Sequence, residues 1–163
     1  MNDIPVELRR GALLLSTDRA RVDVDRVLAW LHDSHWGAAM TRPLLERAME
    51  NSICVGVYDD ARQLAFSRAI TDLATYAYLT DVIVAHEARG RGVGKWMVEA
   101  IVAHPDLQGL RRIALWTRDA RTLYEKFGFS TVTSASTYME LRPRSSGDSF
   151  LRANPALTPT EDG

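Results

Sequence analysis

Apolar residues along the chain gather in short runs that follow either the two-residue spacing of a strand or the wider spacing of a helix. Runs rich in β-branched and aromatic residues, bounded by turn-forming residues, are typical of strands. An acidic turn at residues 59–61 separates two such runs and predicts a hairpin. The strands predicted in this first half are 12–16, 52–58, 64–70 and 74–84.

Helical spacing occurs in two stretches before the hairpin. Val24, Val27, Leu28 and Leu31 form one apolar face. In the second stretch, Thr41 stands where an N-cap is expected and Pro43 fits the first turn. The residues of this second helix predicted to face inward are Leu44, Leu45, Ala48 and Met49.

In the second half of the chain, the apolar spacing predicts a well-buried helix over about 92–103 and a short helix around 120–127. Gly128 is predicted to end the short helix as a left-handed C-cap. Further strands are predicted at 113–117, 129–132 and 137–141. These helices and strands are predicted to form one α/β domain over residues 1–142. Residues 143–163 have a composition typical of disorder and are predicted to be a disordered C-terminal tail.

Composition narrows the classes of protein. The 163 residues are 46% hydrophobic and 25% charged, which is ordinary for a soluble globular domain. The net charge of -1 gives no overall attraction to nucleic acid or membrane. Cys54 is the single cysteine, so neither an intramolecular disulfide nor a cysteine zinc cluster can form. With no apolar run of about 20 residues and no signal-type N-terminus, we expect a cytoplasmic protein that binds neither nucleic acid nor membrane.

Residues 89–95 read Arg-Gly-Arg-Gly-Val-Gly-Lys and join the end of a predicted strand to the start of a predicted helix. The first N–H groups of a helix have no intrahelical partner, and glycine lets an anion approach them closely. Arg89, Arg91 and Lys95 add positive charge to the same segment. This segment therefore predicts a phosphate-binding loop.

Two common phosphate-binding patterns do not fit this loop. A Walker loop needs glycine where Arg89 stands and a hydroxyl residue where Trp96 stands. The dinucleotide fingerprint needs glycine at Lys95 and an acidic residue about 20 positions further on, where the chain has strand 113–117 and then Arg118.

The remaining pattern, Arg89-x-x-Gly92-x-Gly94, resembles the acetyl-CoA pyrophosphate loop of the GNAT superfamily of N-acetyltransferases. A second segment, about 30 residues later, resembles the Ala-x-x-Leu-Tyr-x-x-x-Gly-Phe helix of that family. Its matching residues are Ala120, Leu123, Tyr124, Gly128 and Phe129.

The resemblance implies a GNAT-like α/β fold, with a mixed, splayed central sheet flanked by helices, and an acetyl-CoA-dependent N-acetyltransferase. It implies direct acetyl transfer, in a ternary complex, to a primary amine of a small molecule or peptide, and a homodimer is left open. We expect no metal, because the four histidines lack a ligand-like grouping with carboxylates. Two other functions stay open: an acyl-CoA-binding module without turnover, and a partner-binding protein whose loop takes another anion.

In the family, the loop backbone binds the pyrophosphate, and the strand before the loop pairs with the pantetheine arm as an added strand would. Thr117 stands where the family often has an asparagine that binds this arm, and its hydroxyl can still make one such bond. The cofactor-binding residues implied are Val82, Ile83, Val84, Arg89, Gly90, Arg91, Gly92, Val93, Gly94, Lys95, Thr117, Ala120 and Leu123.

Acetyl transfer to an amine needs a proton acceptor, because a lysine-type amine with a pKa of about 10.4 is mostly protonated at neutral pH. It also needs an acid for the departing thiolate. The resemblance makes Tyr124 the candidate acid, and the alternative is a ring that only packs on the helix. Asp81 is the candidate base, and the alternative is a carboxylate paired with an arginine or capping a bulge. Asp72 and His86 are weaker candidates for the base.

The resemblance implies that substrate choice comes from the segment between the first two helices and from the hairpin, with further aromatic residues on the long strand. His35, Trp36 and Tyr78 are the candidate acceptor-binding residues. Their rings suit an amine through apolar and cation–π contact, although they are also ordinary core residues.

Overall fold

The computed structural model describes residues 5–132 and residue 139. Its strands are β1 Glu7–Arg10, β2 Leu13–Ser16, β3 Ile53–Asp59, β4 Arg62–Thr71, β5 Tyr76–Val84 and β6 Arg112–Leu115. Its α-helices are α1 Val24–His32, α2 Arg42–Glu50, α3 Val93–Val102 and α4 Arg121–Glu125. All of them lie in the first of two compact units, residues 1–130, and the second unit is residues 131–163.

The six strands form one sheet in the order of the sequence, from β1 to β6. Neighbouring strands are antiparallel except for β5 and β6, which are parallel. The sheet is therefore mixed, as predicted. β5 pairs with β4 as far as Val84, but its pairing with β6 ends at Leu79. The two strands part beyond that residue, which is the predicted splay.

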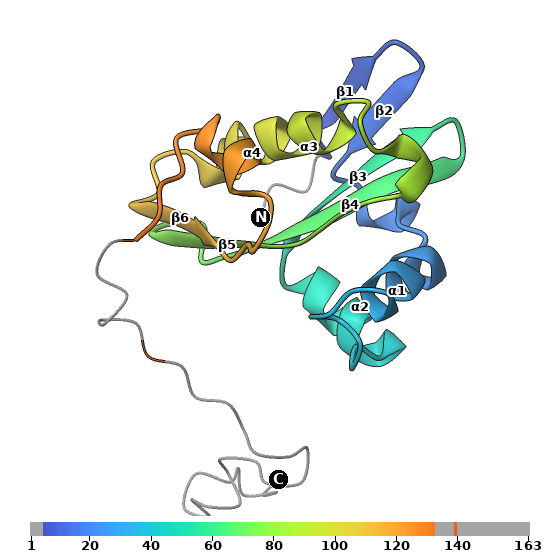
Figure 1. Ribbon diagram of the computed structural model, residues 1–163, viewed down its shortest axis with the longest axis horizontal. Helices are drawn as coiled ribbons and strands as arrows, with labels where there is room; N and C mark the ends of the chain where they lie inside the picture. The colour runs from blue at the N-terminus through green and yellow to red at the C-terminus, as the bar shows by residue number, and fades with distance from the viewer. Residues whose placement is uncertain (1–4, 133–138, 140–163) are drawn as a thin grey trace, which may run out of the picture. The chain divides into compact units, whose positions relative to one another are not determined.

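Helices cover both faces of the sheet (Figure 1): α3 and α4 lie on one face, α1 and α2 on the other. Each face has its own apolar cluster. Met97 and Val98 of α3 pack in the cluster that contains Leu79 of β5. Val27 of α1 and Leu45 of α2 belong to the second cluster. Successive strand residues point to opposite faces, which is why one strand serves both clusters.

The first strand and details of α2 differ from the sequence predictions. β1 was not predicted because all four of its residues are exposed and mostly polar, as an edge strand allows. Thr41 occupies the N-cap position of α2 but makes no side-chain capping bond. Leu44 is 41% exposed, so its predicted inward position is wrong, while Leu45 and Met49 are buried. The apolar face of this helix is narrower than its sequence suggested.

The C-terminal end of the described chain also differs. Gly128 has a φ of 85°, which confirms the left-handed residue predicted after α4. Residues 129–132 have no regular secondary structure, so the strand predicted there is wrong. Val132 is 71% exposed, and no described strand lies beside it to supply hydrogen bonds. The predicted strand 137–141, apart from Met139, and the tail 143–163 lie outside the described residues, and the domain limit at 142 stays a prediction.

Candidate active site

The glycine loop leads from β5 into α3 through two backbone turns of positive φ. Gly90 has a φ of 74°, and Gly92, the N-cap of α3, has a φ of 78°. The first bond of the helix joins the Trp96 N–H to the Gly92 carbonyl at 3.0 Å. The amides of Val93, Gly94 and Lys95 precede that bond and have no acceptor within the helix. The loop therefore presents helix amides at its mouth, as an anion site requires.

A pocket of about 280 Å³ opens beside this loop. It joins the end of β5, the loop and α4, three segments that are distant in the sequence. Most of the predicted cofactor residues line it, and Ala88 is a lining residue that the sequence reasoning missed. Its lining is Val84, Ala88, Arg89, Gly90, Gly92, Val93, Gly94, Lys95 and Leu123.

Gly94 explains how closely α3 approaches β5. A Cβ added at this position would lie 3.2 Å from Cγ2 of Val84, which is tighter than an ordinary contact. Arg89 folds back over the end of the same strand, and its Nε donates to the Val84 carbonyl at 3.1 Å. The close approach that Gly94 allows and the bond from Arg89 both place the loop against the last residue of β5. The amides, the basic side chains and the absence of a Cβ fit a diphosphate group at this helix terminus.

Among the described strands, only β4 pairs with the segment of β5 that precedes the loop. Ile83 and Val84 pair with β4, whereas β6 no longer follows the other edge of β5. Val82 and Val84 pack toward the α3 cluster, and Ile83 belongs to the opposite cluster. The free edge beyond Leu79 is where the pantetheine arm was predicted to pair.

Tyr124 is 7% exposed and belongs to the α3 cluster, which Leu123 also contacts. Its ring meets Phe129 edge to face, with centroids 5.8 Å apart. Burial, and to a smaller extent the charge of Asp119, raises the pKa of Tyr124 to about 12. The phenol therefore stays protonated throughout the neutral range, as a proton donor must.

Thr117 forms a hydrogen bond with the residue that precedes α4. Its Oγ1 accepts a hydrogen bond from the Ala120 N–H at 3.0 Å. The hydroxyl proton stays available for donation, so the predicted bond to the pantetheine arm is compatible with this capping bond. Residues 117 and 120, both implied by the resemblance, are thus brought together by one local turn.

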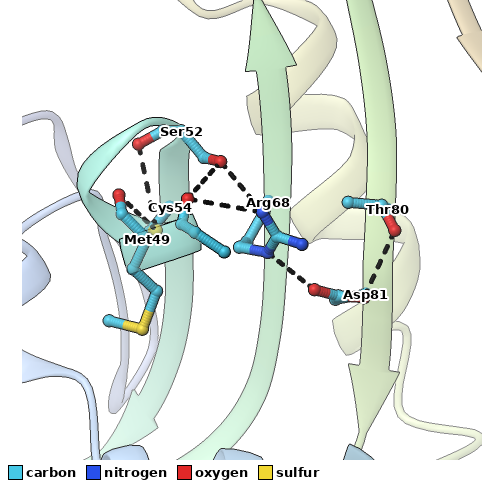
Figure 2. Close-up of polar contacts among 7 residues, drawn as sticks. Met49, Ser52, Cys54, Arg68, Thr80 and Asp81 are labelled. Atoms are coloured by element: carbon cyan, nitrogen blue, oxygen red, sulfur yellow. Dashed lines mark hydrogen bonds and ion pairs between the residues drawn. The ribbon is translucent and has the colours of Figure 1, made fainter. Parts of the chain in front are cut away.

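Asp81 is buried in an ion pair (Figure 2). Its Oδ2 accepts from Nε of Arg68 at 2.6 Å, and its Oδ1 accepts from the Thr80 hydroxyl at 3.2 Å. This is the arginine pairing that the sequence left as the alternative for Asp81. The proton-acceptor role is not tested by this geometry and stays a prediction. Arg68 was missed, although a charged residue inside the apolar run 64–70 was a signal for it.

The two weaker candidates for the base lie in different surroundings. Asp72 accepts from the N–H groups of Ala74, Thr75 and Tyr76 at 2.8–3.0 Å. These bonds, with the Thr75 hydroxyl as the largest cause, hold the pKa of Asp72 well below its usual range. A carboxylate stabilised in this way is a poor proton acceptor. His86 is exposed in the short helical turn His86–Ala88 that precedes the loop.

The candidate acceptor residues lie outside the lining of the pocket described above. His35 and Trp36 meet edge to face, with ring centroids 4.8 Å apart, and Trp36 is 54% exposed. Nδ1 of His35 lies 3.2 Å from Nη2 of Arg118, which follows β6. The segment between α1 and α2 therefore touches the segment between β6 and α4. Tyr78 is half-buried on β5.

Within residues 5–132 and at residue 139, no three His, Cys, Asp or Glu side chains are grouped so that they could hold a metal ion. No helix in the described part of the chain has the length and apolar character needed to cross a membrane.

Comparison with known proteins identifies the class. The family model for the acetyltransferase (GNAT) domain matches residues 50–131. FG08082 of Gibberella zeae, whose name classes it among acetyltransferases, is 33% identical over 145 residues, 75% of this chain and 81% of that protein. A solved structure from Xanthomonas campestris pv. campestris, described as a GNAT-family protein, is 41% identical with a TM-score of 0.78, over 82% of this chain and 95% of that one.

The chain belongs to the GNAT acetyltransferase family, and membership implies acetyl transfer from acetyl-CoA. A further relative is the chloroplastic serotonin N-acetyltransferase 2 of Oryza sativa subsp. japonica. It is 34% identical over 92 residues, which are 53% of this chain and 46% of that protein. The sequence resemblance to this family is thereby confirmed.

Proposed function

We propose that this protein transfers an acetyl group from acetyl-CoA to a primary amine of a small molecule or peptide, by direct transfer in a ternary complex. The observation that carries the proposal is the pocket that joins the glycine loop to Leu123, the residue next to Tyr124. The rice relative is named for N-acetylation, which supports an amine as acceptor.

Acetyl-CoA supplies the acetyl group as a thioester. The α3 amides and Lys95 would bind the diphosphate, and the free edge of β5 would align the pantetheine arm. A bond forms between the nitrogen of the neutral amine and the acetyl carbon while the carbon–sulfur bond breaks, so this nitrogen loses one proton and sulfur gains one. An amine that binds as an ammonium ion gives up a further proton to water before it attacks. Tyr124 would donate the proton that sulfur gains. Asp81 is the proposed acceptor of the amine proton, and its pairing with Arg68 is the competing interpretation.

The direct test is a panel of amines, amino acids, polyamines and peptides incubated with acetyl-CoA, with CoA release and product mass as readouts. We expect at least one amine to gain an acetyl group, without an acetylated enzyme forming when acetyl-CoA is supplied alone. An acetylated enzyme that passes its group to the amine would contradict direct transfer.

Tyr124→Phe separates an enzyme from a binding module. We expect kcat to fall by about 10²–10⁴-fold, because general acid catalysis contributes that much, while CoA affinity is unchanged. Tyr58→Phe is a matched control, since Tyr58 is also buried and its hydroxyl has no hydrogen-bond partner among the residues that the structure describes. If Tyr124→Phe keeps full turnover, the acid role is wrong, and if the wild-type protein binds CoA without any turnover, the binding module gains support.

A cytoplasmic location and a homodimer are likewise proposals, taken from composition and from family resemblance. Size-exclusion chromatography with light scattering measures the oligomeric state directly.

A further inference from the structure

Arg68 is a buried charge in the middle of the sheet. Its side chain is 7% exposed and that of Asp81 is 4% exposed. Besides the Asp81 carboxylate, Arg68 donates from Nη1 to Oγ of Ser52 at 3.0 Å and to the Ala48 carbonyl at 3.4 Å. Figure 2 shows the guanidinium between Ser52 on one side and Asp81 on the other. This one side chain therefore joins the end of α2 to β5 across β4.

Asp81 has a backbone conformation that L-residues rarely adopt. Its φ is 53°, in the left-handed region, although it is not a glycine. Arg68 pairs with Thr80 and Phe66 pairs with Ile83, so two β5 residues, Asp81 and Val82, face one β4 residue. The strand has a β-bulge at this point, with Asp81 as one of its two residues.

The bulge reverses which side chains face α3. Before it, Ala77 and Leu79 pack in the α3 cluster; after it, Val82 and Val84 pack there. Odd-numbered residues face α3 before the bulge and even-numbered residues face it afterwards, because one extra residue in a strand moves every later side chain to the opposite face. Pairing with β6 also ends at Leu79, two residues before Asp81. The bulge thus coincides with the splay of β5 from β6 and sets the edge and the face that lead to the pocket.

We propose that Arg68 is a positioning residue for acetyl transfer: by holding the Asp81 carboxylate it keeps the left-handed bulge and so sets the register of 82–84 beside the cofactor pocket. Both Asp81 oxygens already accept hydrogen bonds in this arrangement. The hydrogen-bond partners given above for Arg68 are Asp81, Ser52 and Ala48, which do not line the pocket, so Arg68 would act through the backbone of β5. This inference rests on the proposed function for its catalytic meaning, whereas the effect on the backbone can be measured independently.

The test compares Arg68→Met, Asp81→Gly and the double variant with Arg47→Met, an exposed arginine of α2 taken as the matched control. We expect Arg68→Met to lower kcat by at least about tenfold, because small misplacements of reacting groups have effects of this size. The affinity for CoA should change less than kcat, since the glycine loop is untouched. Arg47→Met should behave as the wild type.

The double variant is the decisive one. Glycine adopts a positive φ without strain and leaves no buried carboxylate unpaired, so the double variant should fold even if Arg68→Met does not. Both glycine variants remove the proposed proton acceptor, so they are read by their backbone and their affinity for CoA, and we expect the double variant to bind CoA as the wild type does. If Arg68→Met folds and keeps the kcat of the wild type, Arg68 does not position the site and the proposal is overturned.

Crystal structures give a readout that does not need activity. We expect residue 81 to leave the left-handed region in Arg68→Met and to keep it in the double variant. An Arg68→Met structure with an unchanged φ at residue 81 and with Val82 still facing α3 overturns the proposal. If the wild-type protein acetylates no amine, the proposed function fails, whereas these structures still decide whether Arg68 holds the bulge.

Discussion

The glycine loop and the bulge of β5 both contain residues of positive φ, but this backbone conformation is stabilised in a different way in each. In the loop, Gly90 and Gly92 take φ values of 74° and 78°. Glycine adopts these values without a steric penalty, and a Cβ at either position would meet open space. In the bulge, Asp81 takes a φ of 53° and is held by a buried ion pair with Arg68.

This difference shows where each conformation is encoded. A glycine turn depends on the residue itself and little on its neighbours. The Asp81 turn depends on a side chain 13 positions away in the sequence, and on the end of α2, which binds that side chain. We therefore expect the loop to tolerate changes elsewhere in the protein and the bulge to respond to distant ones.

The largest effect is expected from breaking the ion pair. Arg68→Met leaves the Asp81 carboxylate buried and unpaired, and we expect the free energy of unfolding to fall by about 3–5 kcal/mol. Adding Asp81→Gly should restore much of this loss, because no charge is left buried. Arg47→Met should change stability by no more than about 0.5 kcal/mol. Urea denaturation of the wild type, Arg68→Met, the double variant and Arg47→Met measures these free energies of unfolding. Equal losses in Arg68→Met and in the double variant would show that the unpaired carboxylate is not the cause.

A smaller effect is expected in the loop. Gly92→Ala forces a Cβ into a left-handed position, and we expect a loss of about 1–2 kcal/mol of unfolding free energy together with weaker CoA binding. Gly109→Ala is the matched control, because Gly109 has a φ of 76°, open space around it and no part in the pocket. It should lose similar stability and keep CoA affinity. Calorimetric titration with CoA separates the two, and equal affinities in both variants would exclude the loop as the diphosphate site.

Gly94 tests the close contact between the loop helix and β5. Alanine favours a helix by up to about 1 kcal/mol over glycine, but its Cβ would crowd Val84. We expect Gly94→Ala alone to change the unfolding free energy by less than about 1 kcal/mol. In a Val84→Ala background, the same substitution should stabilise. A double-mutant cycle by thermal denaturation measures this coupling, and additive effects would show that the contact with Val84 does not matter.

The smallest effect concerns pH and the phenol of Tyr124, which packs in the α3 cluster. The pKa of Tyr124 is raised to about 12 in the folded protein, against about 10 when unfolded. A raised pKa stabilises the fold fully below about pH 10, and that stability is lost as the pH rises through about 12. Subtracting the profile of Tyr124→Phe from that of the wild type isolates this contribution. A difference that stays constant from pH 9 to 12 would mean that burial does not shift the pKa of this phenol.

Local features of the site were predictable from the sequence. Gly92, Gly94 and the basic residues beside them identified the loop, and the spacing from Ala120 to Gly128 identified α4. Their conformations follow from short-range sterics and hydrogen bonds, which neighbouring residues alone decide.

Long-range features were not predictable. The pairing of Arg68 with Asp81 joins two strands, and the contact of His35 with Arg118 joins segments 83 residues apart. Nor did periodicity show β1, because an edge strand is stabilised by backbone hydrogen bonds and needs no apolar side chains.

By itself, the sequence determined the order of the four α-helices and of strands β2 to β6, the glycine loop and the helix that contains Tyr124. Each depends on spacing, glycine or capping chemistry within a few residues. Only the tertiary structure decided that Leu123 lies at the pocket of the loop, that β5 parts from β6 at the bulge, and that Asp81 is paired. These features depend on which side chains meet across the sheet, and burial makes such meetings strong because water no longer competes for the same charges and hydrogen bonds.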